Sequence, residues 1–457
     1  MEFTNLSFLY LWLPPVLAAY FLARSIRVKN AILLGFSLVF YAMGQPLYLL
    51  MLVGLSGLNF YLSRKIHPGR QITVLIPVAV NIAVLVLFKY LDRTPNGVMP
   101  MGVSFYTFSA ISYLVDIYRG RIPAEKRFSL LLLYLTMFPK ILQGPIVRYT
   151  DIASQLRRRT TDPEAIFQGA LRFSCGLAKK VLLADYCGKI IAELSGVGSD
   201  ACFLGAWFTG LLFFFQIYFD FSGYSDMAIG LGRIFGFTYR ENFDLPYMSR
   251  SLTEFWRRWH ISLGSFFMDY VYIPLGGNRR GWKRHVLNLL AVWSLTGLWH
   301  GAHWNYLLWG LYFFAFLVAE KKHADRLKAL PDLVRRAITI ALVFFGWVLF
   351  AHEDPKELGT ILLSMVGFHG FSAPGMGLKL LNSLPLIAVC TLACTSLPRW
   401  VLTYWYFICR MDKKEGRMTA AKIPHLVSGI AVIALLLWLY TVSLVGNTSA
   451  PSIYGGF

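Results

Sequence analysis

Two histidines interrupt an otherwise uncharged stretch of this sequence, residues 288–319. Apart from His300 and His303, the side chains there are apolar, aromatic, small or uncharged polar. An imidazole takes and returns a proton near neutral pH, and an ionisable group inside a membrane span is costly, so it is usually kept for function. One histidine can activate a hydroxyl for attack on a thioester or ester once donor and acceptor are positioned. We therefore expect His300 to be a general base.

The neighbours of His300 have the character of a cavity lining. Gly301 has no side chain, so we expect another backbone or an acyl chain to approach it closely. Trp299 and Trp304 are expected to form the wall of the cavity. We expect His303 to be a hydrogen-bonded neighbour of the site and not a second base.

A basic and aromatic stretch, residues 251–260, supplies a second group of candidates. Together with residues 263–274 it has amphipathic character, which predicts a position at the cytoplasmic interface. Trp256, Arg257 and Arg258 suit the phosphates and adenine of a nucleotide-like donor, and they suit lipid headgroups equally well. His260 is either a second active-site imidazole or an interfacial one.

Two acids, Asp220 and Asp226, follow a long apolar run and alternate with small and aromatic residues. One interpretation is a polar wall of a substrate channel, to which Ser222 and Tyr224 would contribute. The other is that both acids are structural and are neutralised by nearby arginines. We favour the structural role because buried acids are usually paired.

Several other chemistries are excluded by missing motifs. The sequence has no G-x-S-x-G nucleophile elbow, no G-x-x-x-x-G-K-[ST] phosphate loop and no HExxH zinc motif. Its six cysteines show no paired CxxC spacing for a metal or redox site. We therefore expect neither a metal ion nor a bound cofactor.

The composition is that of an all-α polytopic membrane protein. Hydrophobic residues make up 56% of the 457 residues, and apolar stretches of about 20 residues, the length needed to cross a bilayer, recur roughly ten to twelve times. The formal charge of +20 resides in short loops between the apolar runs. This distribution predicts cytoplasmic loops by the positive-inside rule, with Met1 outside, and argues against nucleic acid as a partner.

The chain is expected to form a single membrane-embedded domain, residues 1–457, with a catalytic core at about residues 100–320. Ordinary spans are expected at residues 6–23, 31–44, 47–62 and 72–88. Residues 139–304 differ because polar, Gly and Pro residues punctuate apolar segments. Broken and re-entrant helices at membrane depth are tolerated only where they line a cavity or are buried in protein. The middle of the chain therefore predicts helices around a central tunnel.

At these residues the sequence resembles the membrane-bound O-acyltransferase family, and within it the bacterial alginate O-acetylase (AlgI-type) branch. A specific part of the resemblance is the uninterrupted run Tyr272-Ile273-Pro274-Leu275-Gly276-Gly277-Asn278-Arg279. The other resembling segments extend over most of the chain and are residues 101–108, 139–148, 176–180, 218–236, 242–243, 255–260 and 299–304.

The resemblance implies a fold and a set of site residues. His300 matches the family's membrane-embedded catalytic histidine, and His260 matches its second characteristic histidine. Asn242 joins the residues assigned to the tunnel. The implied fold is a ring of transmembrane helices, thinned at the centre, whose re-entrant segments let a cytoplasmic acyl thioester meet an acceptor from outside. Arg257 and Arg258, on the cytoplasmic side, would suit the phosphates of the donor.

The implied activity is transfer of an acetyl group, with acetyl-CoA or another acetyl thioester as donor substrate. His300 would take the proton of the acceptor hydroxyl, and the thiol would leave toward the cytoplasm. The resemblance also implies the bacterial cytoplasmic (inner) membrane as location. The implied partner is an extracytoplasmic polysaccharide acetyltransferase-type protein, which would complete O-acetylation of an alginate-like polymer.

Two other functions stay open. The D-alanyl transfer protein of teichoic acid synthesis shares looser forms of the motifs around Asp220 and His260, although the intact run at residues 272–279 favours the acetylase. A transporter or flippase for an acylated polymer would also explain many spans and a buried imidazole. The tail, residues 452–457, matches the aromatic-rich tail of the alginate branch only in its Ile-Tyr and final Phe, so the resemblance does not extend to docking of the partner through the tail.

Overall fold

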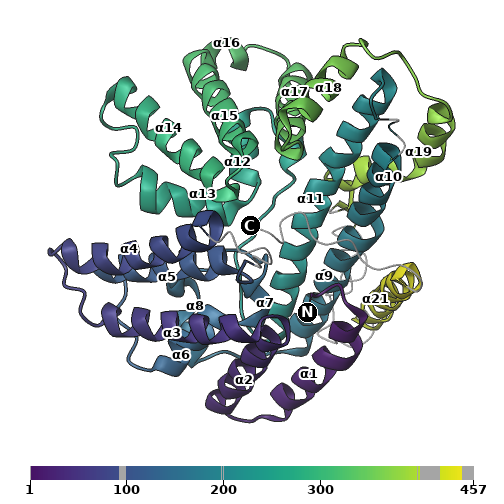
Figure 1. Cartoon of the computed structure of the whole chain (residues 1–457). Helices are drawn as coiled ribbons and strands as arrows, with labels where there is room; N and C mark the ends of the chain where they lie inside the picture. Colours follow the sequence, from purple (N-terminus) through teal and green to yellow (C-terminus); the bar gives the residue numbers. More distant parts are fainter. Residues whose placement is uncertain are drawn as a thin grey trace, which may run out of the picture.

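Long apolar helices dominate the computed structural model of this chain (Figure 1). The structure describes residues 2–91, 99–196, 198, 200–398, 400–401 and 422–444; Cys409 and the tail at residues 452–457 lie outside them. Every regular element in these ranges is a helix, which confirms the all-α architecture. Seven of these helices are long and apolar enough to cross a membrane, so this is a multi-pass membrane protein. They are Ile26–Gly44, Pro46–Ser63, Ile72–Tyr90, Phe203–Ile234, Asp332–Ala351, Met376–Ala393 and Val427–Leu444.

The chain order divides the helices into an N-terminal group, a central pair with its connections, and a C-terminal group (Figure 1). The N-terminal group consists of η1 (Phe8–Trp12), α1 (Leu13–Leu22), α2 (Ile26–Gly44), α3 (Pro46–Ser63), α4 (Ile72–Val86), η2 (Leu87–Leu91), α5 (Val103–Tyr118), α6 (Phe128–Thr136), α7 (Phe138–Ile141) and α8 (Tyr149–Arg157). The central part consists of α9 (Pro163–Ala178), η3 (Lys179–Ala184), α10 (Asp185–Gly196) and α11 (Phe203–Ile234).

Short, broken helices follow α11, as the Gly, Pro and polar residues in the middle of the sequence predict. They are η4 (Pro246–Met248), α12 (Leu252–Arg258), α13 (Ile261–Phe267) and η5 (Met268–Tyr272). The C-terminal group is α14 (Gly281–His300), α15 (Trp304–Lys322), α16 (Ala324–Lys328), α17 (Asp332–Ala351), α18 (Pro355–Met365), α19 (Met376–Ala393) and α21 (Lys422–Leu444). Within the described residues, the seven long helices and the shorter apolar helix Phe8–Leu22 are fewer than the ten to twelve spans expected from the sequence.

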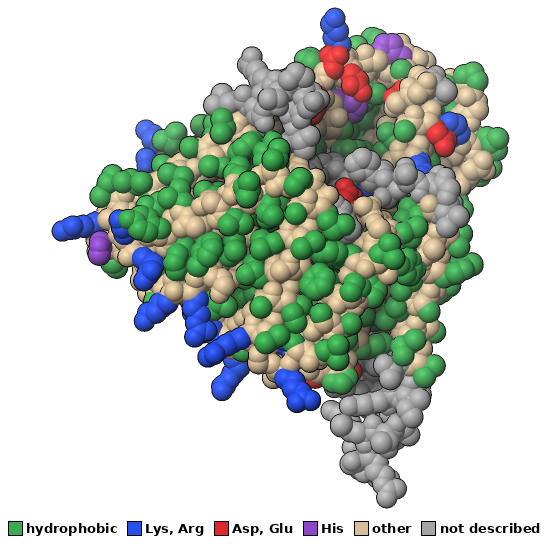
Figure 2. Space-filling view, turned by 60° about the horizontal axis from the view of Figure 1, so that its bottom comes forward, with side chains coloured by type: hydrophobic (Ala, Val, Ile, Leu, Met, Phe, Trp, Pro, Cys, Tyr) green, Lys and Arg blue, Asp and Glu red, His purple; other side chains and the backbone are tan. Residues whose placement is uncertain are grey.

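Charged side chains are distributed unevenly over the surface. Figure 2 shows Lys and Arg gathered along one edge of a face that is otherwise largely hydrophobic. A hydrophobic face bordered by cations on one side is what a bilayer and the positive-inside rule require. This arrangement agrees with a cytoplasmic position for the basic loops.

Helices α9 and α11 cross so closely that only glycine fits at their contact. A Cβ atom on Gly176 would lie 2.6 Å from the carbonyl oxygen of Gly223, and one on Gly169 would lie 2.7 Å from that of Gly230. The reverse substitutions at Gly223 and Gly230 meet the same obstacle. Small residues at regular spacing let membrane helices approach backbone to backbone. The pair therefore forms a fixed seam through the middle of the fold.

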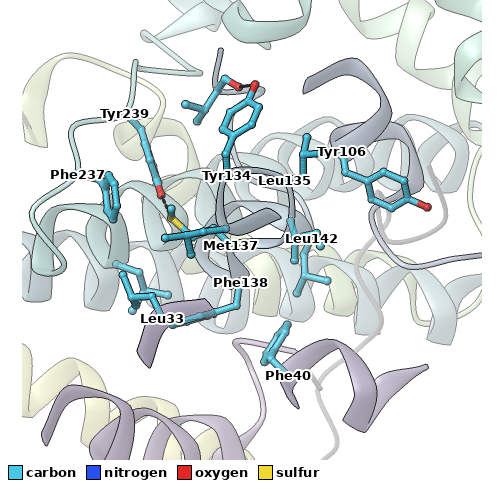
Figure 3. Packing of buried hydrophobic residues seen from close by; sticks show 14 of the residues in the cluster. Leu33, Phe40, Tyr106, Tyr134, Leu135, Met137, Phe138, Leu142, Phe237 and Tyr239 are labelled. Carbon is cyan, nitrogen blue, oxygen red and sulfur yellow. Dashed lines mark hydrogen bonds between the residues drawn. The ribbon is translucent and has the colours of Figure 1, made fainter. Parts of the chain in front are cut away.

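A buried core around α7 connects this seam to residues 142–148, which lie between α7 and α8 (Figure 3). Tyr239 points at Met137, and its hydroxyl donates to the Met137 sulfur at 3.0 Å. Tyr134 donates to the carbonyl oxygen of Val147 at 2.8 Å. The neighbouring amide of Ile146 donates to the hydroxyl of Ser262 at 3.0 Å. The core thus holds residues 142–148 against the start of α13.

The glycine seam predicts a strong effect of a single methyl group. We expect Gly176→Ala to lower the free energy of unfolding by about 1–3 kcal/mol, because overpacking forces the two backbones apart. Gly54→Ala on α3 is the matched control, since no heavy atom lies within 4 Å of its added Cβ. Thermal unfolding in detergent measures both. Equal midpoints for the two variants would contradict the tight crossing.

Candidate active site

The two short helices α12 and α13 meet at His260. Ser251 caps α12 by accepting a hydrogen bond from the Glu254 amide at 3.0 Å. The carboxylate of Glu320, on α15, accepts from the amides of Leu252 and Thr253 at 2.6 and 3.0 Å. These bonds tie the N-terminus of α12 to α15. His260, for which an active-site and an interfacial role were both open, is buried in the protein, with 4% of its surface exposed.

Both candidate histidines line one cavity of about 540 Å³, bounded by α12, α13, α14 and α15. Its walls are mainly apolar and aromatic, and they include Trp256, Trp293 and Trp309. Aromatic walls exclude water and strengthen the electrostatic interactions of any polar group they enclose. The structure therefore places both candidate imidazoles, together with that of His285, in an environment suited to proton transfer.

A second cavity of about 980 Å³ adjoins the first and has a different character. The two share Thr253, Arg257 and Lys321 in their linings. Most of the charged side chains of the second cavity are basic, namely Arg250, Arg257, Lys321, Arg326, Lys328 and Arg335, and Glu320 is the acidic one. A basic chamber thus leads to an apolar one that contains the histidines.

His300 is the last residue of α14 and is packed among aromatic rings. Its ring centroid lies 5.0 Å from that of Trp309 and 5.1 Å from that of Phe350. Lys89 and Tyr90, at the end of η2, donate to the carbonyl oxygens of Trp299 and Leu298. A cation at the C-terminus of a helix satisfies its last carbonyls and complements its dipole. This contact fixes the end of α14 that carries His300.

Helices α14 and α15 also pack without room for side chains at two positions. A Cβ on Gly297 would lie 2.5 Å from the carbonyl oxygen of Tyr306, and one on Gly310 would lie 2.4 Å from that of Trp293. The hairpin of α14 and α15 is therefore held by close packing between its two helices as well as by the contacts of Lys89 and Tyr90 at the end of α14.

The residues after His300 differ from expectation. A Cβ on Gly301 would lie 2.7 Å from the ring of Tyr306, so the group that approaches this glycine is an aromatic side chain. Trp304 donates its indole N–H to the carbonyl oxygen of Glu353 at 2.6 Å, and neither Trp299 nor Trp304 contributes to the described lining of the cavity. His303 lies in the turn between α14 and α15, 3.4 Å from the Glu353 carboxylate with 58% of its side chain exposed. The wall is instead formed by tryptophans that lie farther away in the sequence.

The acids of α11 lie away from the histidine cavity. Asp220 pairs with Lys180 at 2.8 Å, and Lys180 also pairs with Asp185 at 2.6 Å. Asp226 lies 2.8 Å from Arg172 and 2.6 Å from Lys179. These pairs agree with the structural interpretation, although lysine faces Asp220 where arginine was expected.

The remaining candidates separate into different environments. Ser222, Asp226 and Asn242 line a third cavity of about 1130 Å³, which shares Ile261 with the first. The hydroxyl of Tyr224 donates to Glu2 at 2.9 Å. Arg258 pairs with Glu254 at 2.7 Å and lines neither of the first two cavities, unlike Arg257. Asn242 reaches the site indirectly, since its side-chain oxygen lies 3.1 Å from His260 Nδ1.

Some residues of the site were missed in the sequence. Lys89, Glu320 and Lys321 are charged residues directly at the ends of apolar runs, and this position was the available signal. Trp293 and Trp309 gave no signal, because a tryptophan in an apolar helix is usually an ordinary packing residue.

The fold and the site agree with the comparison to known sequences. The model of MBOAT, the membrane-bound O-acyltransferase family, matches residues 126–352, which include both histidines. Relatives at more than 30% identity cover most of the chain. The chain therefore belongs to the membrane-bound O-acyltransferase family and is an O-acyltransferase.

Three relatives show how similar this chain is to proteins with different named activities. The "Probable alginate O-acetylase AlgI" of Pseudomonas syringae pv. tomato is 36% identical over 449 residues, 93% of this chain and 86% of the relative. The "Peptidoglycan O-acetyltransferase" of Helicobacter pylori is 31% identical, over 81% of this chain and 80% of the relative. The "Teichoic acid D-alanyltransferase" of Bacillus subtilis is 26% identical, over 56% of this chain and 69% of the relative.

The cluster around Lys180 predicts unequal effects of two substitutions. Lys180→Met removes the cation that faces both Asp185 and Asp220, and we expect it to cost about 3–5 kcal/mol of stability. Asp220→Asn should cost less, because Lys180 keeps its ion pair with Asp185. Unfolding in detergent, followed by tryptophan fluorescence, compares the two. If Asp220→Asn proves the more damaging, this charge balance is wrong.

Proposed function

We propose that this protein moves an acetyl group from a cytoplasmic acetyl thioester, such as acetyl-CoA, for O-acetylation of an extracellular or cell-wall polysaccharide. The observation that carries the proposal is the arrangement of the two cavities. His260 and His300 line the apolar one, and Arg257 and Lys321 lie where it meets the basic one. The names of the two acetyl-transferring relatives support acetyl as the group.

The basic cavity suits the phosphorylated end of such a donor. Guanidinium and ammonium groups bind phosphate oxygens through charge-assisted hydrogen bonds. From a nucleotide bound there, the thioester arm would pass Arg257 and enter the aromatic cavity. The acetyl group would then lie beside the histidines, and the polar part of the donor would stay on the side of the basic loops.

The chemistry follows from the position of His300 on the cavity wall. His300 takes the proton from the acceptor hydroxyl as the hydroxyl oxygen attacks the thioester carbonyl carbon. The new C–O bond forms, the C–S bond breaks, and the thiolate takes the proton back from His300. Holding both reactants in one cavity makes the attack effectively unimolecular. The free thiol leaves through the basic cavity.

The acceptor side of the proposal involves a second protein. We expect this chain to reside in the bacterial cytoplasmic membrane and to pass the acetyl group to an extracytoplasmic partner, which completes transfer to the polymer. An alginate-like polysaccharide and a cell-wall glycan are both compatible with the relatives' names. D-alanyl transfer and polymer transport are the competing outcomes of the experiment below.

His300→Ala should abolish acetyl transfer while leaving the amount of folded protein unchanged. We expect a loss of at least about 100-fold, as for removal of a general base. The matched control is His303→Ala, because His303 is exposed in the adjacent turn. The measurement is mild base release of ester-linked acids from envelopes of cells with wild-type or variant protein. Loss of acetate supports the proposal, loss of D-alanine moves it to the teichoic acid reaction, and no loss favours transport.

Arg257 and Arg258 are adjacent residues with different surroundings, and they form a second matched pair. Arg257→Ala should raise the KM for the thioester donor, because Arg257 lies between the two cavities. Arg258→Ala should leave that KM unchanged, since Arg258 pairs with Glu254. Initial rates at varied donor concentration measure both. The same KM for both variants would remove Arg257 from donor binding.

A further inference from the structure

We propose that Asn242 is a positioning residue that holds His260 in one tautomer, with the proton on Nδ1 and the proton-accepting lone pair on Nε2. The inference rests on the proposed acyl transfer and assigns His260 a defined state within it. It follows from a buried hydrogen-bond network in which the direction of each bond is determined.

The side-chain amide of Asn242 can adopt only one orientation. Its Oδ1 lies 3.1 Å from the backbone nitrogen of Ser262, which can only donate. Its Nδ2 donates to the hydroxyl of Ser225 at 2.9 Å. The Ser262 hydroxyl accepts from the Ile146 amide at 3.0 Å and directs its own proton to Asn242 Oδ1 at 2.8 Å. The oxygen of Asn242 therefore acts as an acceptor.

This orientation determines the protonation of His260. Its Nδ1 lies 3.1 Å from Asn242 Oδ1 and 3.5 Å from the Ser262 hydroxyl, whose proton is directed to Asn242 at the shorter distance of 2.8 Å. Two acceptors cannot share a hydrogen bond, so we assign the proton to Nδ1. In the neutral ring the lone pair is then on Nε2. Within the residues that the structure describes, Nε2 is buried and has no hydrogen-bond partner. His260 also lines the cavity that contains His300, so its Nε2 is the ring atom left to accept a hydrogen bond beside the base His300.

The backbone around His260 is held by the same residue. His260 adopts a left-handed conformation with φ of 45°, which is uncommon for a residue with a side chain. The Asn242 carbonyl oxygen accepts from the Ile261 amide at 2.9 Å, and the Asp244 amide donates to the Arg258 carbonyl oxygen at 2.9 Å. Strained conformations persist where the surrounding structure imposes them, and they cluster at functional sites. Asn242 thus fixes both the ring and the chain of His260.

The anchor of Asn242 on its other side is rigid. Ser225 belongs to α11 and is adjacent to Asp226, which pairs with Arg172 and Lys179. The helix that bears it is fixed in turn by the glycine seam with α9. The network therefore extends from the centre of the fold to one ring nitrogen. If Asn242 served packing alone, its substitution would lower stability only, and the effect would be the same with or without His260.

A double-mutant cycle separates a positioning role from a packing role. We expect Asn242→Leu to lower kcat for acetyl transfer by about 100-fold, the lower end of what a positioned proton-transfer group contributes, with the donor KM unchanged. In a His260→Gln background the same substitution should have no further effect, because the group it acts on is absent. Asn242→Asp, which keeps an acceptor, should retain more activity than Asn242→Leu. Equal losses in both backgrounds, at equal stability, would overturn the proposal.

A spectroscopic measurement tests the tautomer without any assay of activity. Solid-state ¹⁵N NMR of histidine-labelled protein in lipid distinguishes Nδ1–H from Nε2–H rings, and His260→Gln identifies the signals of His260. We expect an Nδ1–H ring in the wild type and a change to Nε2–H or a mixture in Asn242→Leu. A wild-type Nε2–H ring would refute the inference. If envelopes show no transferred acyl group, the proposed function fails, and the NMR result still decides the tautomer.

Discussion

The close contact between α9 and α11 is the constraint on which the rest of the structure depends. Four glycines let the two backbones touch, and the polar groups on either side of that contact are placed by it. Lys180 meets Asp220 there, and Arg172 and Lys179 meet Asp226. Ser225, which directly precedes Asp226, is the anchor of the hydrogen-bond network that ends at His260. A methyl group in the seam would therefore disturb stability and the site together.

The polar residues of this apolar chain fall into two classes with different energetics. Arg172, Lys179 and Lys180 face the acids Asp226, Asp220 and Asp185, so that opposite charges offset the cost of burial. The two histidines line a space large enough for a substrate instead. Imidazole suits such a place because its neutral form is cheaper to bury than a carboxylate or an ammonium group. Imidazoles thus occupy the apolar cavity, and the cations Arg257 and Lys321 lie where it meets the basic one.

The sequence predicts the class of fold, and it also identifies the two histidines as candidates. Apolar length identifies the spans, and an imidazole inside one is conspicuous. The partners were not predictable, since Asn242 is 18 residues from His260 and Lys89 lies 210 residues before Trp299 in the chain. The sequence alone does not distinguish the adjacent residues Arg257 and Arg258. Successive residues of a helix point about 100° apart, and only Arg257 faces the cavities. Gly301 was recognised as a close contact, but the identity of the contacting group required the fold.

The anchoring of α12 has a mechanical consequence. Glu320 ties the short helix that leads to His260 to α15, and α15 is locked to α14 by glycines at Gly297 and Gly310. The two imidazoles are therefore borne by one stiff unit, and their separation is set when the chain folds. Neither imidazole has to move toward the other when substrates bind. The structure thus presents a fixed site, to which substrates must move, and does not require the two helices to close around them.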